Sequence, residues 1–163
     1  MLLDYKSIFT ELNRLAIDYV VVGGMAVNFH GIPRMTYDID LMILLEKDNI
    51  EKTVRLLIQW GYRVRIPVDP MELADEEKRN SWRSEKNMKA MNFYSDTLAI
   101  GEIDILFDSP VSYEVMKAHA AIMEIGKEKI PFASIQDLIA MKEHAGRRQD
   151  LSDIEHLRLI MER

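Results

Sequence analysis

The chain has 163 residues, a net charge of −6 and no cysteine. This length suits one domain with a buried core, and the absence of thiols excludes disulfide bonds and thiolate catalysis. Basic residues are interspersed with acids over residues 69–89, which argues against general binding to a nucleic acid duplex. No apolar run is long enough to span a membrane, and the start of the chain lacks the layout of a signal peptide. We therefore expect a cytoplasmic protein.

The first third of the chain predicts alternating helices and strands. Apolar residues at helical spacing indicate the helices, and Gly61 ends the second long one. In chain order we expect a helix over 4–17, a strand at 19–22, a short helix over 25–29, a strand at 39–45, a helix from 50 to about 60, and a strand at 62–66.

The rest of the chain predicts a polar insertion, further strands and two terminal helices. Ser109 and Pro110 have the pattern of a helix N-cap followed by proline at the first helical position. We expect a partly helical segment at 67–86, strands at 88–94 and 102–107, a strand or hairpin at 121–132, and helices over 134–146 and 151–162. The whole predicts a single α/β (α+β) domain over 1–163, with a core to about 132 and a helical extension from about 133 to 163.

Two aspartates dominate the chemistry of the chain. Asp38 and Asp40 lie two residues apart at the start of an apolar strand, so their side chains project to the same face. Neighbouring carboxylates repel each other unless a cation compensates them, and hard oxygen ligands suit Mg²⁺ or Mn²⁺. The alternative is a pair of solvent-facing strand residues.

Two further features favour the metal interpretation. Gly23 and Gly24 lie between a strand and a helix, where exposed backbone N–H groups favour phosphate, although an ordinary tight turn explains them as well. Asp104 lies in another apolar strand and would complete a three-carboxylate cluster if that strand neighbours the first. Glu102 shares its face and is a reserve ligand.

The order and spacing of these motifs over about residues 19–108 resemble the nucleotidyltransferase superfamily of the DNA polymerase β fold. The stretches 23–26 (Gly-Gly-Met-Ala) and 34–41 (Arg-Met-Thr-Tyr-Asp-Ile-Asp-Leu) are similar to minimal prokaryotic members of the AbiEii and MenT toxin type. The resemblance implies a small mixed sheet flanked by helices. It also implies transfer of a nucleoside monophosphate from an NTP such as ATP, with two Mg²⁺ or Mn²⁺ ions on Asp38, Asp40 and Asp104.

The same resemblance extends to the segment from Lys142 to Asp153. It implies that Lys142 and either Arg147 or Arg148 bind nucleotide phosphates, and that an acid, Asp150 or Asp153, supports the site. For Asp150, a cap of the last helix is an equal alternative. For Lys142 we favour the site role over a plain solvent-facing lysine.

Other residues near the aspartates leave two interpretations open. Arg34 and Thr36 precede them closely enough to touch phosphate, although Arg34 also fits a plain loop charge. For His30, and for Trp82 beside the cations of the insertion, we favour structural roles over catalysis or base stacking.

The acceptor hydroxyl is not specified by any residue. An RNA end, a protein and a small molecule are all compatible, and no separate RNA-binding domain is visible. The resemblance adds an antitoxin as an expected partner, and the partly apolar C-terminal helices suit a homodimer. Two alternatives remain: a catalytically silent nucleotide- or protein-binding member of the fold, and a metal-dependent phosphohydrolase.

Overall fold

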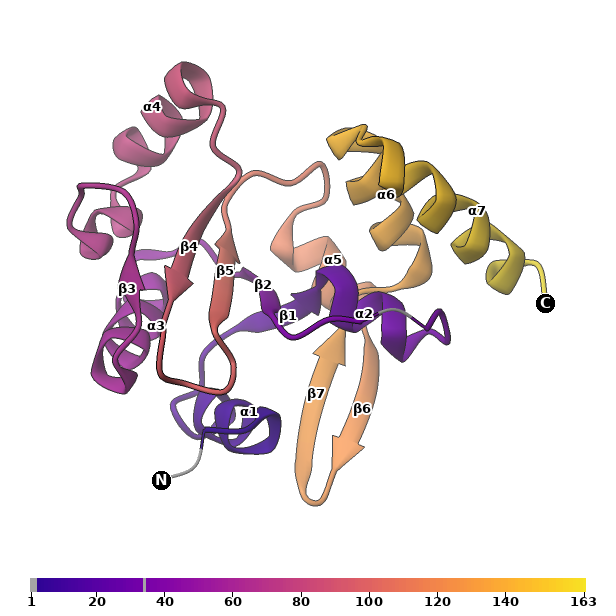
Figure 1. The fold of residues 1–163 in the computed structure, drawn as a ribbon, viewed down its shortest axis with the longest axis horizontal. Coiled ribbons are helices and arrows are strands. Elements are labelled where there is room, and N and C mark those ends of the chain that lie inside the picture. The colour runs from indigo at the N-terminus through magenta and orange to yellow at the C-terminus, as the bar shows by residue number, and fades with distance from the viewer. Residues whose placement is uncertain (1–2, 34) are drawn as a thin grey trace.

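The computed structural model describes residues 3–33 and 35–163, and one mixed β-sheet lies at its centre (Figure 1). The strands are β1 (Tyr19–Val22), β2 (Ile39–Ile43), β3 (Arg63–Val64), β4 (Ala90–Tyr94), β5 (Glu102–Leu106), β6 (Ala121–Ile125) and β7 (Glu128–Phe132). Within these described residues the sheet has seven strands in the order β3-β4-β5-β2-β1-β7-β6. β2 and β5 are parallel, as are β1 and β7, and the other neighbours are antiparallel. The predicted mixed sheet is confirmed.

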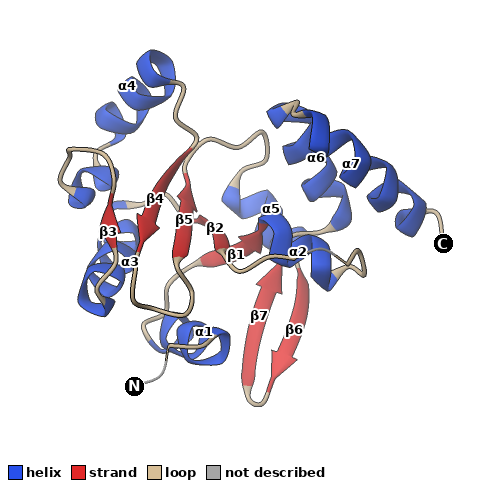
Figure 2. Cartoon of the chain, viewed as in Figure 1, coloured by secondary structure: helices blue, strands red, loops and turns tan. Residues whose placement is uncertain are grey.

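Helices flank this sheet (Figure 2). They are α1 (Tyr5–Arg14), α2 (Gly23–Phe29), α3 (Lys47–Trp60), α4 (Glu76–Lys86), α5 (Tyr113–His119), α6 (Ile135–Ala145) and α7 (Arg148–Met161), with a 3-10 turn at Pro70–Ala74. α6 and α7 pack against each other and form the predicted C-terminal helical end, and α6 also contacts α2. No helix in the described part of the chain combines the length and apolar character needed to cross a membrane.

Local capping explains where the main helices begin and end. The Asp4 carboxylate accepts the N–H of Ser7 at 2.8 Å and starts α1, and the Ser134 hydroxyl accepts the N–H of Asp137 at 3.1 Å and starts α6. α3 ends where Gly61 takes a left-handed conformation with φ of 103°. These boundaries lie close to the predicted ones because each cap is local in sequence.

Several predicted boundaries are wrong. The helix after β5 begins at Tyr113 with Ser112 as its N-cap, because the Ser109 hydroxyl is used in a turn with both backbone groups of Val111. The strand predicted at 62–66 keeps only two residues, Arg63–Val64. The last helix begins at Arg148, three residues before the predicted start.

The two faces of β4 and β5 differ in burial and polarity. Met91 and Phe93 of β4 are fully buried and contribute to the core, as do Ile103 and Ile105 of β5. The residues between them face the other way and are only partly buried. One face of this part of the sheet is therefore core, and the opposite face carries the polar side chains.

Candidate active site

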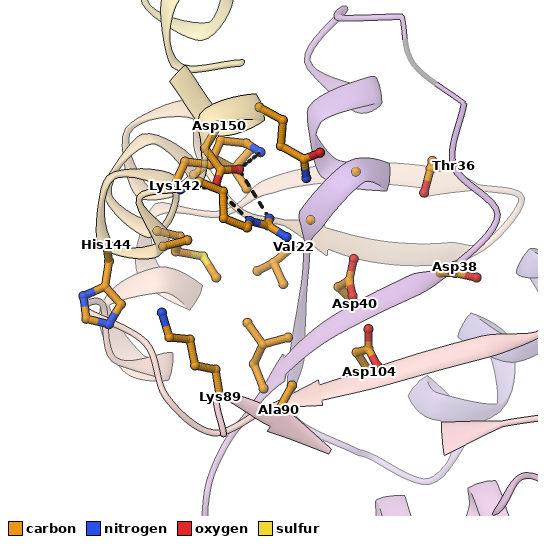
Figure 3. Close-up of a pocket in the computed structure, with 18 of the residues that line it drawn as sticks. Val22, Thr36, Asp38, Asp40, Lys89, Ala90, Asp104, Lys142, His144 and Asp150 are labelled. Atoms are coloured by element: carbon orange, nitrogen blue, oxygen red, sulfur yellow. Dashed lines mark hydrogen bonds and ion pairs between the residues drawn. The ribbon is translucent and has the colours of Figure 1, made fainter. Parts of the chain in front are cut away.

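The register of the central strands brings the polar residues into one row. Asp40 of β2 lies opposite Val22 of β1 on one side and opposite Asp104 of β5 on the other. Asp104 in turn lies opposite Asn92 of β4. Neighbouring strands are about 4.8 Å apart, so the carboxylates of Asp40 and Asp104 lie next to each other, as Figure 3 shows. The expected neighbourhood of the two strands is present.

The environment of Asp40 raises the pKa of its carboxyl group strongly. Burial raises the pKa of Asp40 to about 7, and the charge of Asp104, a hydrogen bond with Asp104 and the charge of Asp38 add to this rise. The guanidinium of Arg147 opposes it. At neutral pH Asp40 therefore holds a proton for part of the time, which indicates negative charge without sufficient compensation.

Asp38 lies at the edge of this pair. Its carboxylate is directed away from Asp40 and Asp104 in Figure 3. Burial raises its pKa, and so do the charges of Glu102 and Asp104 and a hydrogen bond with Glu102. The backbone just before it is held by α1, because the Tyr5 hydroxyl donates to the Tyr37 carbonyl at 3.1 Å.

Asn92 fixes the orientation of Asp104. Its side-chain amide donates to Asp104 Oδ1 at 2.7 Å, and its Oδ1 accepts from Arg65 Nε at 3.3 Å. Because a guanidinium only donates and an ionised carboxylate only accepts, these two partners determine which way the amide points. Asn92 was not identified from the sequence, although its place in the alternation of β4 puts it on the polar face.

Gly23 lies against Asp40 more closely than any other residue type would allow. It has a φ of +68°, and a Cβ built on it would lie 2.1 Å from Asp40 Oδ2. The glycine is therefore required by both its backbone conformation and the space that Asp40 occupies. Gly24 follows it in α2, and both line the cavity described below.

A second cluster of charges joins α6 to α7. The Lys142 ammonium is buried and lies 2.9 Å from Asp153 Oδ2 and 3.5 Å from Asp150 Oδ1. Arg147 donates to Asp150 Oδ2 from its backbone N–H at 3.1 Å and from Nε at 3.0 Å. Burial would raise the pKa of Asp150, but the hydrogen bond and charge of Arg147 and the charge of Lys142 outweigh it and hold that pKa below its ordinary value.

These contacts define what Asp150 does in the fold. It caps the start of α7 as the third residue of a capping box, because its carboxylate accepts the N–H of Arg147, the N-cap residue. Lys142 is not a solvent-facing lysine, because it is buried. The cluster fixes Arg147 near Asp40, each affecting the pKa of the other.

Both groups of residues open onto one cavity of about 730 Å³. Of the predicted site residues, those that line it are Gly23, Gly24, Thr36, Asp38, Asp40, Asp104, Lys142, Arg147 and Asp150. Arg148 is exposed and is not among the lining residues, and Arg34 lies outside the described residues. The cavity also exposes side chains that were not identified from the sequence, namely Tyr37, Lys89, Asp108, His144 and Gln149.

The residues for which structural roles were favoured have structural contacts. His30 Nε2 lies 2.8 Å from the Ala133 carbonyl. Trp82 is buried and packs against Phe107, so its ring is not available to stack on a base.

The donor chemistry fits a divalent cation that also binds substrate. Among the described residues, no group of three or more histidine, aspartate or glutamate side chains forms a complete protein metal site. Mg²⁺, however, is usually bound by one or two carboxylates together with substrate phosphates. The Asp40–Asp104 pair, with its oxygen ligands and uncompensated charge, matches that donor set.

Comparison with known proteins identifies a family. The family model described as nucleotidyl transferase AbiEii toxin, type IV TA system, matches residues 8–158. No curated protein sequence matches the chain.

Solved structures share the fold at low sequence identity. The lincomycin-bound lincosamide antibiotic adenylyltransferase LnuA is 19% identical, with a TM-score of 0.61 over 98% of this chain and 99% of that one. The putative nucleotidyltransferase TM1012 from Thermotoga maritima is 17% identical, with a TM-score of 0.53 over 97% and 91%. ANT(2")-Ia in complex with adenylyl-2"-tobramycin is 13% identical, with a TM-score of 0.53 over 95% and 91%. The fold is therefore the polymerase β-like nucleotidyltransferase fold.

Replacing Gly23 by alanine tests the close approach to Asp40. Gly61→Ala is the matched control, since Gly61 also has a positive φ but no atom within 4 Å of the place a Cβ would take. We expect the control to lose about 1 kcal/mol of unfolding free energy from backbone strain alone. Gly23→Ala should lose about 2–4 kcal/mol, because Asp40 must also move. Chemical denaturation measures both, and equal losses would contradict the packing of Gly23 on Asp40.

The raised pKa of Asp40 predicts a pH-dependent stability. Between its ordinary value of 3.8 and the folded value of about 7, the folded protein keeps a proton that the unfolded chain has released. The free energy of unfolding therefore falls as the pH rises through this window. Above it the penalty is complete, at about 2–4 kcal/mol.

Asp40→Asn removes this penalty, so the variant should be more stable than the wild type by more at pH 8 than at pH 5. Denaturation in metal-free buffer at the two pH values measures the difference. A stability gain that is the same at both values would show that Asp40 does not titrate in this range.

Proposed function

Because the chain belongs to the family of AbiEii nucleotidyl transferase toxins, we propose that it transfers a nucleoside monophosphate from an NTP to an acceptor hydroxyl in a metal-dependent reaction. The observation that carries the proposal is the pairing of Asp40 with Asp104 across parallel strands. The pair opens onto a cavity that Gly23, Gly24 and Arg147 also line.

Each residue has a separate task in the proposed reaction. Asp40 and Asp104, with Asp38 beside them, would hold two Mg²⁺ or Mn²⁺ ions, which neutralise triphosphate charge and activate a hydroxyl when bound. The backbone at Gly23 and Gly24 borders the triphosphate, since no Cβ intervenes there. Arg147 adds positive charge close to Asp40, and the bonds of Asp150 hold its guanidinium in place before the substrate arrives.

The chemical step balances with these groups. The acceptor oxygen loses its proton to the Asp104 carboxylate and forms a bond to the α-phosphorus. The bond between the α-phosphorus and the bridging oxygen breaks, and pyrophosphate leaves. Asn92 donates to Asp104 Oδ1 and so holds the carboxylate in one orientation for this step.

The biological role follows from the family. We propose that the chain acts as the toxin of a toxin–antitoxin pair, with an antitoxin as its partner. LnuA is described as acting on lincosamide antibiotics, and ANT(2")-Ia is described with an adenylylated tobramycin. A small-molecule acceptor therefore belongs in the test beside RNA ends and proteins.

Pyrophosphate release from each NTP, with Mg²⁺ or Mn²⁺ and with RNA, protein or small-molecule acceptors, tests the proposal. Asp40→Asn and Asp104→Asn should each lower the rate by about 100-fold or more, because each removes charge stabilisation at the reacting phosphate. Asp96→Asn, at an exposed carboxylate with a weak 3.7 Å pair to Arg63, is the matched control and should keep the rate.

The alternatives give different results in the same assay. NTP binding without pyrophosphate release under any acceptor would identify a silent nucleotide-binding protein. Release of inorganic phosphate without an acceptor would identify a phosphohydrolase. Unchanged release from both aspartate variants, or release that survives removal of the metal with EDTA, would overturn the proposed mechanism.

A further inference from the structure

The positive charges that the sequence assigned to phosphate binding are largely used within the protein. Lys142 has two carboxylate partners, at 2.9 and 3.5 Å. Arg147 binds Asp150 through Nε at 3.0 Å and Nη2 at 3.3 Å. The two cations and the two acids, Asp150 and Asp153, cancel in formal charge. Even with the two divalent ions proposed above, the aspartates and an NTP together carry an excess of negative charge, so a further cation would strengthen binding.

Lys89 is in a position to supply that cation. It comes directly before β4 and lines the same cavity as Asp40 and Asp104. Figure 3 shows its side chain extending into the space between the strands and α6. Among the described residues no acid or carbonyl is paired with its ammonium group, in contrast to Lys142.

The backbone under Lys89 is held firmly. Its carbonyl accepts the N–H of Phe107 at 2.9 Å and the N–H of Asp108 at 3.1 Å. Next along the chain, Ala90 is paired with Leu106 of β5. The start of the side chain is therefore fixed by the sheet, and only the flexible stem has to order when a ligand binds.

Asp108, whose backbone N–H binds the Lys89 carbonyl, does not form an ion pair with the Lys89 ammonium group. Asp108 has other neighbours: the Arg83 guanidinium, with Nε at 3.5 Å, and the His144 imidazole, with Nε2 at 3.6 Å. An ammonium group left without a carboxylate partner in a cavity attracts an anion.

We propose that Lys89 binds the outer phosphates of the NTP, an inference that rests on the nucleotidyl transfer proposed above. Lys89 lies three residues from Asn92, about 10 Å along the strand from the row that contains Asp104. Gly23 follows Val22, which lies in the same row, so the glycines border the NTP near its α-phosphate. A triphosphate that runs from there toward the end of β5 brings its outer phosphates to Lys89. A lysine ammonium is a compact charge that binds phosphate oxygens without demanding one fixed geometry.

Calorimetry on the full chain with Mg²⁺ and a non-hydrolysable NTP, compared with the matching NMP, tests this assignment. Lys89→Met keeps the length of the side chain and removes its charge, and should weaken NTP binding by about 10- to 100-fold. NMP binding should change little, because an NMP lacks the outer phosphates. Lys89→Arg should recover part of the affinity. Lys86→Met, at an exposed lysine at the end of α4, is the matched control and should bind like the wild type.

The outcomes separate this inference from the proposed function. A wild-type chain that binds no NTP overturns both. A wild type that binds NTP with the same affinity as Lys89→Met overturns only the role of Lys89, and shows a solvated lysine at the rim. An equal loss for NTP and NMP assigns Lys89 to the nucleoside and also overturns it. Matching unfolding midpoints for all variants exclude misfolding as the cause of a loss.

Discussion

Two like charges held side by side govern the arrangement of this protein. The parallel pairing of β2 with β5 places Asp40 against Asp104, and their partial burial reduces the screening of their repulsion by water. As a result the pKa of Asp40 is raised to about 7, and the charge of Arg147 opposes this rise. A partly buried carboxylate without a full partner lowers the stability of the fold. Stability alone therefore does not explain why both acids are present. The proposed binding of a divalent cation and a triphosphate would account for this repulsion, because the cation would compensate the two charges.

The elements around the pair follow from this constraint. Position 23 requires glycine because Asp40 occupies the space that a Cβ would take. Asn92, anchored by Arg65, holds one oxygen of Asp104. On the opposite side, α6 and α7 form their own charge cluster around Asp150, and it holds the arginine that faces Asp40. Residues far apart in sequence thus line one cavity. The sheet positions Asp40 and Asp104, and the C-terminal helices position Arg147.

How much of this could be predicted from the sequence depends on the range of the interaction. The strand alternation that puts Asp104 on the polar face is local and can be seen in the sequence. That Asp104 lies beside Asp40 was expected only from the resemblance to a known family. The boundary at Ser109 was wrong because a serine that caps a helix and one that closes a turn have the same short-range pattern. The burial of Lys142 could not be predicted from its own helix, because it depends on ion pairs with two acids of α7. Lys89 has no sequence signature, since only the register of β4 on β5 brings it to the cavity.

The distribution of charge around the cavity also bears on the order of binding. On the side of α6 and α7 the charges of the described cluster cancel, so they prepare a position for Arg147 without attracting ligand over a long range. On the side of the sheet the acids are in excess and repel a free triphosphate. In the proposed reaction, a nucleotide that arrives with Mg²⁺ already bound would carry less negative charge and would bring a cation to Asp40 and Asp104. The proposed mechanism therefore favours binding of the metal–nucleotide complex as one unit over binding of the two in sequence.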